Sequence, residues 1–246
     1  MRINVYSDKF SGTLSAAEVL KTVTSVFKDV DIQANYFPVT DGGEHSTQIL
    51  KHYNMQTEMI TMTRDFIGNW IPVEYLNVDN DIYFESASLI GVNNTSDHPF
   101  NLDTSALAEV IPNIDVLSLG GSRTVDGGVG LMSSLGIEFY TEENIITNPK
   151  PRDFKDITAV KIADSFAKLE LRVLTDTSIP LLGSNSAIAT YGPQKGLNKK
   201  DIKYLEEQLE RIYDILSLEL GIPLDPFKKD TGAAGGLSFA LGEIFG

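Results

Sequence analysis

The spacing of hydrophobic residues in the first third of the chain predicts two successive strand–loop–helix units. Residues 3–6 are rich in β-forming side chains, and after a turn-like segment Ser15 and Glu18 form the pattern of a helix capping box. The apolar positions that follow have helical spacing and share one face. A second strand over about 32–39 leads into a glycine turn and a short helix that ends near Tyr53.

Alternating and β-branched runs between residues 56 and 85 predict antiparallel strands. Asp79 and Asn80 mark a hairpin turn between strands over 70–78 and 82–85. The rest of the chain returns to strands that alternate with helices. We predict strands at 116–119 and 171–175, and helices at 128–135, at 201–218 and in the small-residue segment that starts with 230–236.

The composition excludes several classes of protein. The chain has 246 residues, with 20 Lys and Arg against 34 Asp and Glu, so its net charge of −14 argues against nucleic acid as a partner. It contains no cysteine, which excludes disulfides, thiol nucleophiles and iron–sulfur ligation. No apolar run approaches the roughly 18 residues of a membrane span. We therefore expect a soluble cytoplasmic protein of one or two domains without a membrane partner.

Four segments place an aspartate and glycines between a strand and a helix, at residues 8–12, 41–44, 120–128 and 230–236. Glycine lets backbone N–H groups approach an anion, and such loops gather beyond the carboxyl ends of strands in α/β sheets. A phosphate or carboxylate ligand is therefore favoured by the four segments together, although any one of them alone is more often a tight turn with a helix cap. The aspartates are candidates either for Mg²⁺ binding through water or for helix capping. Lys195 lies between glycines, where it can meet a phosphate or simply be an exposed turn lysine.

The order of these motifs resembles the bacterial glycerate 2-kinases from end to end. The motifs are DKFSGTLS, DGGE, GGSRTVDGGVGL, DTSIPLLGSNSA, GPQKG and GAAGGL. The resemblance implies an α/β fold with a Rossmann-like doubly wound domain and a second α/β domain. Residues 1–70 with 225–246 would form the first domain and residues 71–224 the second.

The resemblance also implies ATP-dependent phosphorylation of D-glycerate to 2-phosphoglycerate, with ATP and Mg²⁺ as cofactors. It leaves the metal ligands unassigned. The residues it implies for catalysis are Asp8, Lys9, Asp176 and Lys195. Those it implies for substrate or nucleotide binding are Ser11, Gly12, Asp41, Gly42, Gly43, Gly120, Gly121, Ser122, Arg123, Asp126 and Gly127.

The chain departs from the family pattern at several of these motifs. Lys9 and Ser11 have exchanged places around a phenylalanine, and Arg123 and Val125 replace an alanine and an asparagine. The family continues with a further segment that carries a T-G-E-G motif, whereas this sequence stops at Gly246. The alternative is thus a catalytically impaired or non-catalytic relative that binds a small anionic ligand or a partner chain. An open sheet edge would favour a homodimer or a complementary C-terminal chain.

Overall fold

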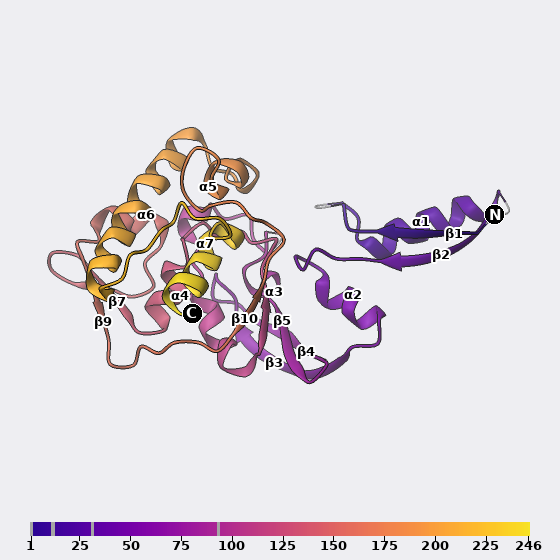
Figure 1. The fold of residues 1–246 in the computed structure, drawn as a ribbon, viewed down its shortest axis with the longest axis horizontal. Helices are drawn as coiled ribbons and strands as arrows, with labels where there is room; N and C mark the ends of the chain where they lie inside the picture. Colours follow the sequence, from indigo (N-terminus) through magenta and orange to yellow (C-terminus); the bar gives the residue numbers. More distant parts are fainter. Residues whose placement is uncertain (1, 11–12, 31, 93) are drawn as a thin grey trace.

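The computed structural model describes residues 2–10, 13–30, 32–92 and 94–246. It is a mixed α/β structure, as predicted, and Figure 1 shows a large body from which an N-terminal layer extends. The strands are β1 (Arg2–Ser7), β2 (Gln33–Pro38), β3 (Gln56–Arg64), β4 (Trp70–Val78), β5 (Asp81–Glu85), β6 (Val116–Ser118), β7 (Ile137–Tyr140), β8 (Ile145–Ile146), β9 (Ala159–Ile162) and β10 (Arg172–Leu174). The α-helices are α1 (Ala16–Lys28), α2 (Ser46–His52), α3 (Ala87–Ile90), α4 (Val129–Ser134), α5 (Ala187–Tyr191), α6 (Lys199–Leu220) and α7 (Ala233–Phe239).

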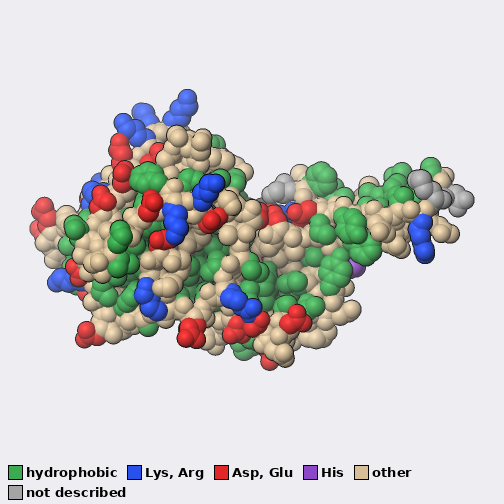
Figure 2. Space-filling view, viewed as in Figure 1, with side chains coloured by type: hydrophobic (Ala, Val, Ile, Leu, Met, Phe, Trp, Pro, Cys, Tyr) green, Lys and Arg blue, Asp and Glu red, His purple; other side chains and the backbone are tan. Residues whose placement is uncertain are grey.

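The N-terminal layer consists of the parallel strands β1 and β2 and the helix α1. The strands pair in register from Arg2 opposite Gln33 to Ser7 opposite Pro38. Helix α1 begins with the predicted capping box, in which the Ser15 side chain accepts from the Glu18 N–H. Hydrophobic side chains stay exposed along this layer, as Figure 2 shows. They include Tyr6, which stacks on Phe37 and is 64% exposed.

The body is built on a five-stranded sheet with the order β10-β6-β5-β4-β3. Strands β5, β6 and β10 are parallel, whereas β3, β4 and β5 form the predicted antiparallel meander. Asp79 and Asn80 both adopt positive φ at the predicted hairpin turn. The parallel strands end together near Glu85, Ser118 and Leu174, so the loops that follow them start at one edge of the sheet.

One hydrophobic core joins this sheet to the helices of the body. Helix α6 extends slightly beyond its predicted bounds and buries Leu205, Leu209 and Ile212 on one face. A second sheet, with the order β8-β7-β9, was not predicted. Its strands have two to four residues, which is too short for an alternating pattern to stand out.

The C-terminal segment packs in the body rather than with the N-terminal layer. Phe239 lies against Tyr213 of α6 with ring centroids 4.2 Å apart, and the Leu169 N–H donates to the Phe245 carbonyl. These contacts join residues 225–246 to the body, and the division into residues 1–70 with 225–246 and residues 71–224 stays a prediction. Glycines allow this packing, because a Cβ on Gly236 of α7 would lie 2.7 Å from the Cα of Gly127, and a Cβ on Gly128 would lie 2.4 Å from the Cβ of Ala240.

The space around Gly127 gives a test of this packing. Gly127 has φ of +66°, and a Cβ there would lie 2.0 Å from the Tyr213 hydroxyl oxygen. We expect Gly127→Ala to lower the free energy of unfolding by about 3 kcal/mol, from overpacking and backbone strain together. The matched control is Gly221→Ala, because Gly221 has φ of +68° but a Cβ there would have no neighbouring atom within 4 Å. Gly221→Ala should lower the free energy of unfolding by about 1 kcal/mol. Equal losses in denaturant unfolding would contradict the packing argument.

Candidate functional site

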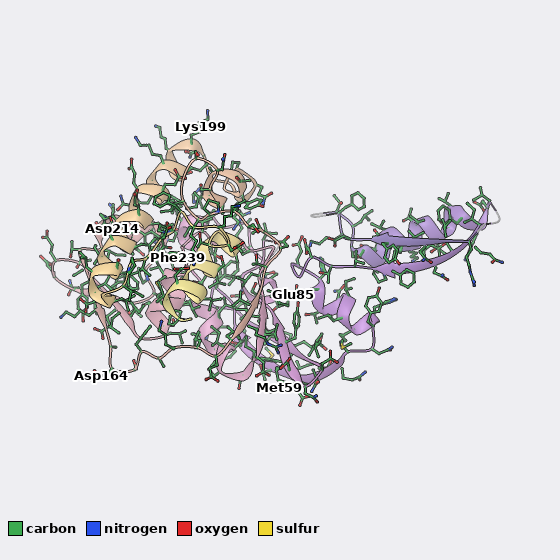
Figure 3. All side chains as sticks on the ribbon, viewed as in Figure 1. Met59, Glu85, Asp164, Lys199, Asp214 and Phe239 are labelled. Atoms are coloured by element: carbon green, nitrogen blue, oxygen red, sulfur yellow. The ribbon has the colours of Figure 1, made fainter. Side chains whose placement is uncertain are left out.

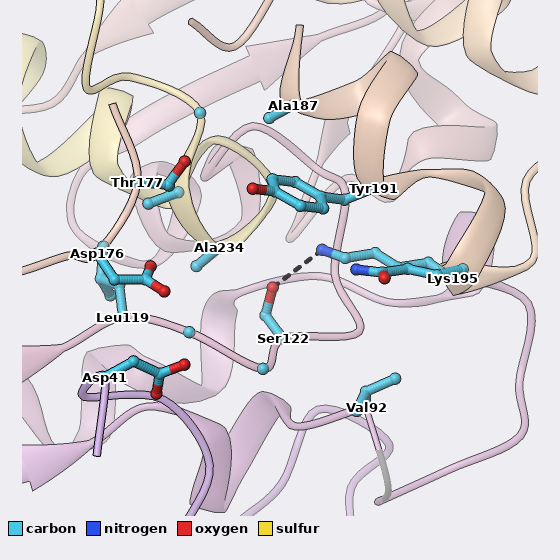
Figure 4. Close-up of a pocket in the computed structure, with 16 residues that line it drawn as sticks. Asp41, Val92, Leu119, Ser122, Asp176, Thr177, Ala187, Tyr191, Lys195 and Ala234 are labelled. Carbon is cyan, nitrogen blue, oxygen red and sulfur yellow. Dashed lines mark hydrogen bonds between the residues drawn. The ribbon is translucent and has the colours of Figure 1, made fainter. Parts of the chain in front are cut away.

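A pocket with a volume of about 330 Å³ lies where loops from several parts of the chain meet. The loop after β6 and the segment after β10 contribute two walls. The end of α5 with the turn after it, and the start of α7, contribute the others. Figure 4 shows side chains from these elements pointing into one space.

Backbone groups form much of this wall. Gly120, Gly121 and Ser122 follow β6, and Gly121 has φ of +62°. On the facing segment Ala234 and Gly235 have φ of +50° and +68°. Turn conformations of this kind allow backbone N–H groups to approach an anion. The backbone of this pocket is therefore suited to an anionic group such as phosphate.

Lys195 supplies a cation to the same wall. Its ammonium donates to the Ser122 hydroxyl at 3.0 Å and to the Thr124 carbonyl at 2.8 Å. The side chain is buried, and no carboxylate of the described residues forms an ion pair with it. Burial lowers the pKa of Lys195 to about 7, although the charge of Asp126 opposes this shift. An anion that enters the pocket would provide the missing counter-charge.

Two carboxylates lie across the pocket from Lys195. Figure 4 shows Asp41 and Asp176 on one side and Lys195 on the other. Asp41 accepts from the Lys9 ammonium at 2.8 Å and from the Gly43 N–H at 2.8 Å. Burial opposes ionisation of Asp41, but these two hydrogen bonds and the charge of Lys9 outweigh it and lower its pKa. Asp41 therefore carries a negative charge into the pocket.

Asp41 reaches the pocket because two glycine loops touch through their backbones. A Cβ on Gly120 would lie 2.7 Å from the Cα of Gly43, so no larger residue fits at this crossing. Gly42 lies beside Ser118, and Gly121 faces Glu44 in the same way. Gly42 and Gly43 do not line the pocket themselves, and their role is to bring the loop of Asp41 against the body.

Asp126 and Gly127, predicted to bind ligand, lie beneath the pocket and do not line it. Asp126 is fully buried and accepts from the N–H and hydroxyl of Thr104 and from the Gly130 N–H. Burial and the charge of Asp103 raise its pKa to about 6, while these hydrogen bonds oppose the shift. In the structure both residues support the start of α4.

Three other predicted residues also lie outside the pocket wall. The Arg123 guanidinium donates to the Asp97 carbonyl instead of pointing into the pocket. Asp8 and Lys9 line a smaller cavity of about 120 Å³. Lys9 is connected to the main pocket by its ion pair with Asp41, which lines that pocket. The remaining two predicted residues, Ser11 and Gly12, lie outside the described residues.

The pocket also contains residues that the sequence did not single out. Thr177 directly follows Asp176, and Tyr191 directly precedes the GPQKG motif. Their position next to those motifs was the signal in the sequence that could have identified them as pocket residues. Figure 4 shows the ring of Tyr191 beside Lys195, with its hydroxyl group toward the pocket and Ala187 nearby.

Residues 3–246 match the model of the glycerate kinase family. The chain belongs to this family. Glycerate kinase of Neisseria meningitidis serogroup B is 24% identical to it, over 98% of this chain and 68% of its own length. Glycerate kinase of Halalkalibacterium halodurans is 28% identical, over 97% and 67%. The chain thus spans about two thirds of these family members.

A crystal structure of a candidate glycerate kinase 2 from Salmonella typhimurium LT2 has a similar fold, with a TM-score of 0.70 at 23% identity. The similarity covers 98% of this chain and 70% of that chain. The family model confirms the family assignment, and the solved structure confirms the mixed α/β fold, while the Rossmann-like two-domain division stays a prediction. In the part of the chain that the structure describes, no helix is both long and apolar enough to cross a membrane.

The lowered pKa of Lys195 predicts pH-dependent anion binding. Lys195 is charged below its pKa of about 7 and neutral above it, so the pocket attracts an anion more strongly at low pH. Sulfate is a suitable probe because its own charge stays constant across this range. Its affinity should fall about tenfold between about pH 6 and about pH 8, as one Lys195 proton is lost.

Lys195→Met is the control for this titration. It should bind sulfate weakly and with little pH dependence, because the titrating cation has been removed. Calorimetric titrations of both proteins across the range would measure the effect. The same pH dependence in the variant would assign it to another group.

Proposed function

We propose that the protein phosphorylates D-glycerate to 2-phosphoglycerate with ATP as the donor. The observation that carries the proposal is the composition of the pocket in a chain of the glycerate kinase family. A backbone anion cradle and a buried lysine face two carboxylates across a space of about 330 Å³. Phosphoryl transfer depends mainly on positioning and charge neutralisation, which this arrangement supplies.

The phosphates would lie on the loop Gly120–Ser122, where the backbone N–H groups and Lys195 can contact their oxygens. The facing turn at Ala234 and Gly235 would close the other side. The ring of Tyr191 and the methyl group of Ala187 would contact the less polar part of the nucleotide. Membership of the family implies the use of ATP, and this placement is our proposal for its orientation.

The carboxylates of Asp41 and Asp176 fit a Mg²⁺ ion that arrives with the nucleotide. The described residues contain no group of three or more His, Cys, Asp or Glu that would bind a metal unaided. Two carboxylates beside a phosphate site match the usual protein contribution to Mg²⁺ binding. When bound, the ion would neutralise charge on the phosphates. Lys9 would act on Asp41, keeping its carboxylate ionised and oriented.

A non-catalytic relative that binds a small anion or a partner chain is the second candidate. The Lys9–Asp41 ion pair favours it, because this lysine lies two residues before the position of the lysine in the family pattern and is already paired with a carboxylate. Val125, which replaces an asparagine of that pattern, is buried in the core and offers no polar group. In this case the pocket would still bind anions but would not transfer phosphate.

A partner fits either candidate function. Strands β1 and β2 form a sheet of only two strands among the described residues, and exposed apolar side chains lie along the same layer. Such a layer gains stability from a further strand or a second surface. A complementary chain or a second copy of this chain would provide it.

An assay of ADP release with D-glycerate and Mg-ATP tests the kinase proposal, with enolase as a coupling enzyme that detects 2-phosphoglycerate. We expect turnover in the unmodified protein and a loss of at least about a hundredfold in Asp176→Asn, because a carboxylate in the pocket is neutralised. Asp164→Asn is the control, since Asp164 is exposed outside the pocket wall. A folded protein that binds ADP without turnover would favour the non-catalytic candidate.

A further inference from the structure

Glu85 is a buried carboxylate at the end of β5 to which the sequence assigned no role. Its side chain accepts from the His45 N–H at 2.8 Å, from the Thr47 N–H at 2.8 Å and from the Ser46 hydroxyl at 3.0 Å. It is 7% exposed, and Figure 3 shows it between the body sheet and the N-terminal segment. One carboxylate thus holds three consecutive residues of another part of the chain.

These contacts replace the missing cap of α2. His45, the residue before the helix, has φ of +71° and makes no side-chain capping hydrogen bond. Glu85 accepts the first free N–H groups of the helix from outside, where a negative charge is also favoured by the helix dipole. The Ser46 hydroxyl lies 2.6 Å from the Tyr83 hydroxyl, which lies 2.6 Å from the Ser118 hydroxyl. Hydrogen bonds therefore connect helix α2 directly to β5 and, through the Tyr83 hydroxyl, to β6.

Helix α2 begins directly after the loop that contains Asp41. Residues 41–44 lie between β2 and α2, and Gly43 of this loop presses against Gly120. The backbone of Gly43 also donates to the Asp41 carboxylate. A shift of His45 would move Gly43 and with it the carboxylate that lines the pocket.

We propose that Glu85 is a positioning residue that fixes the N-terminal layer on the body and thereby sets Asp41 in the ligand pocket. The role of Asp41 toward a nucleotide-bound metal rests on the proposed function, whereas its placement by Glu85 does not. Glu85 itself does not line the pocket, so it acts through the backbone of residues 43–47.

A distance measurement without ligand tests the placement. The chain has no cysteine, so spin labels attach only at introduced sites, here Lys28→Cys in α1 and Lys199→Cys in α6. Both positions are exposed. Pulsed electron resonance should give a narrow distance distribution, which Glu85→Gln should broaden at least about twofold because a neutral amide cannot accept all three hydrogen bonds. Glu85→Asp is the second variant if the glutamine form does not fold.

Asp65→Asn is the matched control. Asp65 is also 7% exposed and accepts from the N–H groups of Ile67 and Asn69, but it does so in the β3–β4 hairpin. It should lower stability without changing the distance distribution. An unchanged distribution in a folded Glu85 variant would overturn the proposal, and so would equal broadening in Asp65→Asn.

Binding of Mn-ATP, with Mn²⁺ as a paramagnetic probe for Mg²⁺, tests the effect on Asp41. Glu85→Gln should weaken Mn-ATP binding about tenfold, as is typical when the support of a metal ligand is lost. Asp41→Asn should have a similar effect, and the double variant should lie within about twofold of Asp41→Asn. If the losses of Mn-ATP affinity in the two single variants added in the double variant, the proposal that Glu85 acts through Asp41 would be overturned. If the unmodified protein bound no Mn-ATP, the proposed function would fail, and the distance measurement alone would decide the role of Glu85.

Discussion

The site depends on a backbone contact between two glycine loops, Gly43 on the N-terminal side and Gly120 on the body. The contact joins the end of β2 to the end of β6 and brings Asp41 opposite Lys195. Because glycines have no side chains, the Gly43–Gly120 contact buries little apolar surface and contributes little to stability. The hydrogen bonds from His45, Ser46 and Thr47 to Glu85 hold the two loops together, because the buried charge of Glu85 is satisfied only in this arrangement.

The electrostatics of the pocket explain how a protein with a net charge of −14 can attract an anion. The attraction is local and comes from backbone N–H groups and from Lys195, which the surface charge does not neutralise. Asp126 lies below this lysine, and its charge partly offsets the pKa shift that burial causes in Lys195. The acidic side, Asp41 and Asp176, would repel a bare phosphate and so suits a phosphate that carries a cation.

The sequence predicted most of the local structure and six of the sixteen residues that line the pocket. The capping box at Ser15, the hairpin at Asp79 and the long helix α6 have strong local signals, and the structure contains all three. The aspartate-and-glycine pattern was ambiguous, because the same pattern exposes Asp41 in the pocket and buries Asp126 against Thr104. Glu85 had no signal at all, since its partners lie about forty residues earlier and are mostly backbone groups.

The N-terminal layer links the stability of the fold to the function of the site. It supplies Asp41 and Lys9, yet in the described structure its sheet has only two strands and Tyr6 is exposed beside Phe37. A two-stranded sheet has marginal stability, so the anchor at Glu85 and the covering of the exposed face act on the same equilibrium. A surface that covers the layer would therefore strengthen ligand binding without touching the ligand, because it would favour the arrangement in which Asp41 lines the pocket.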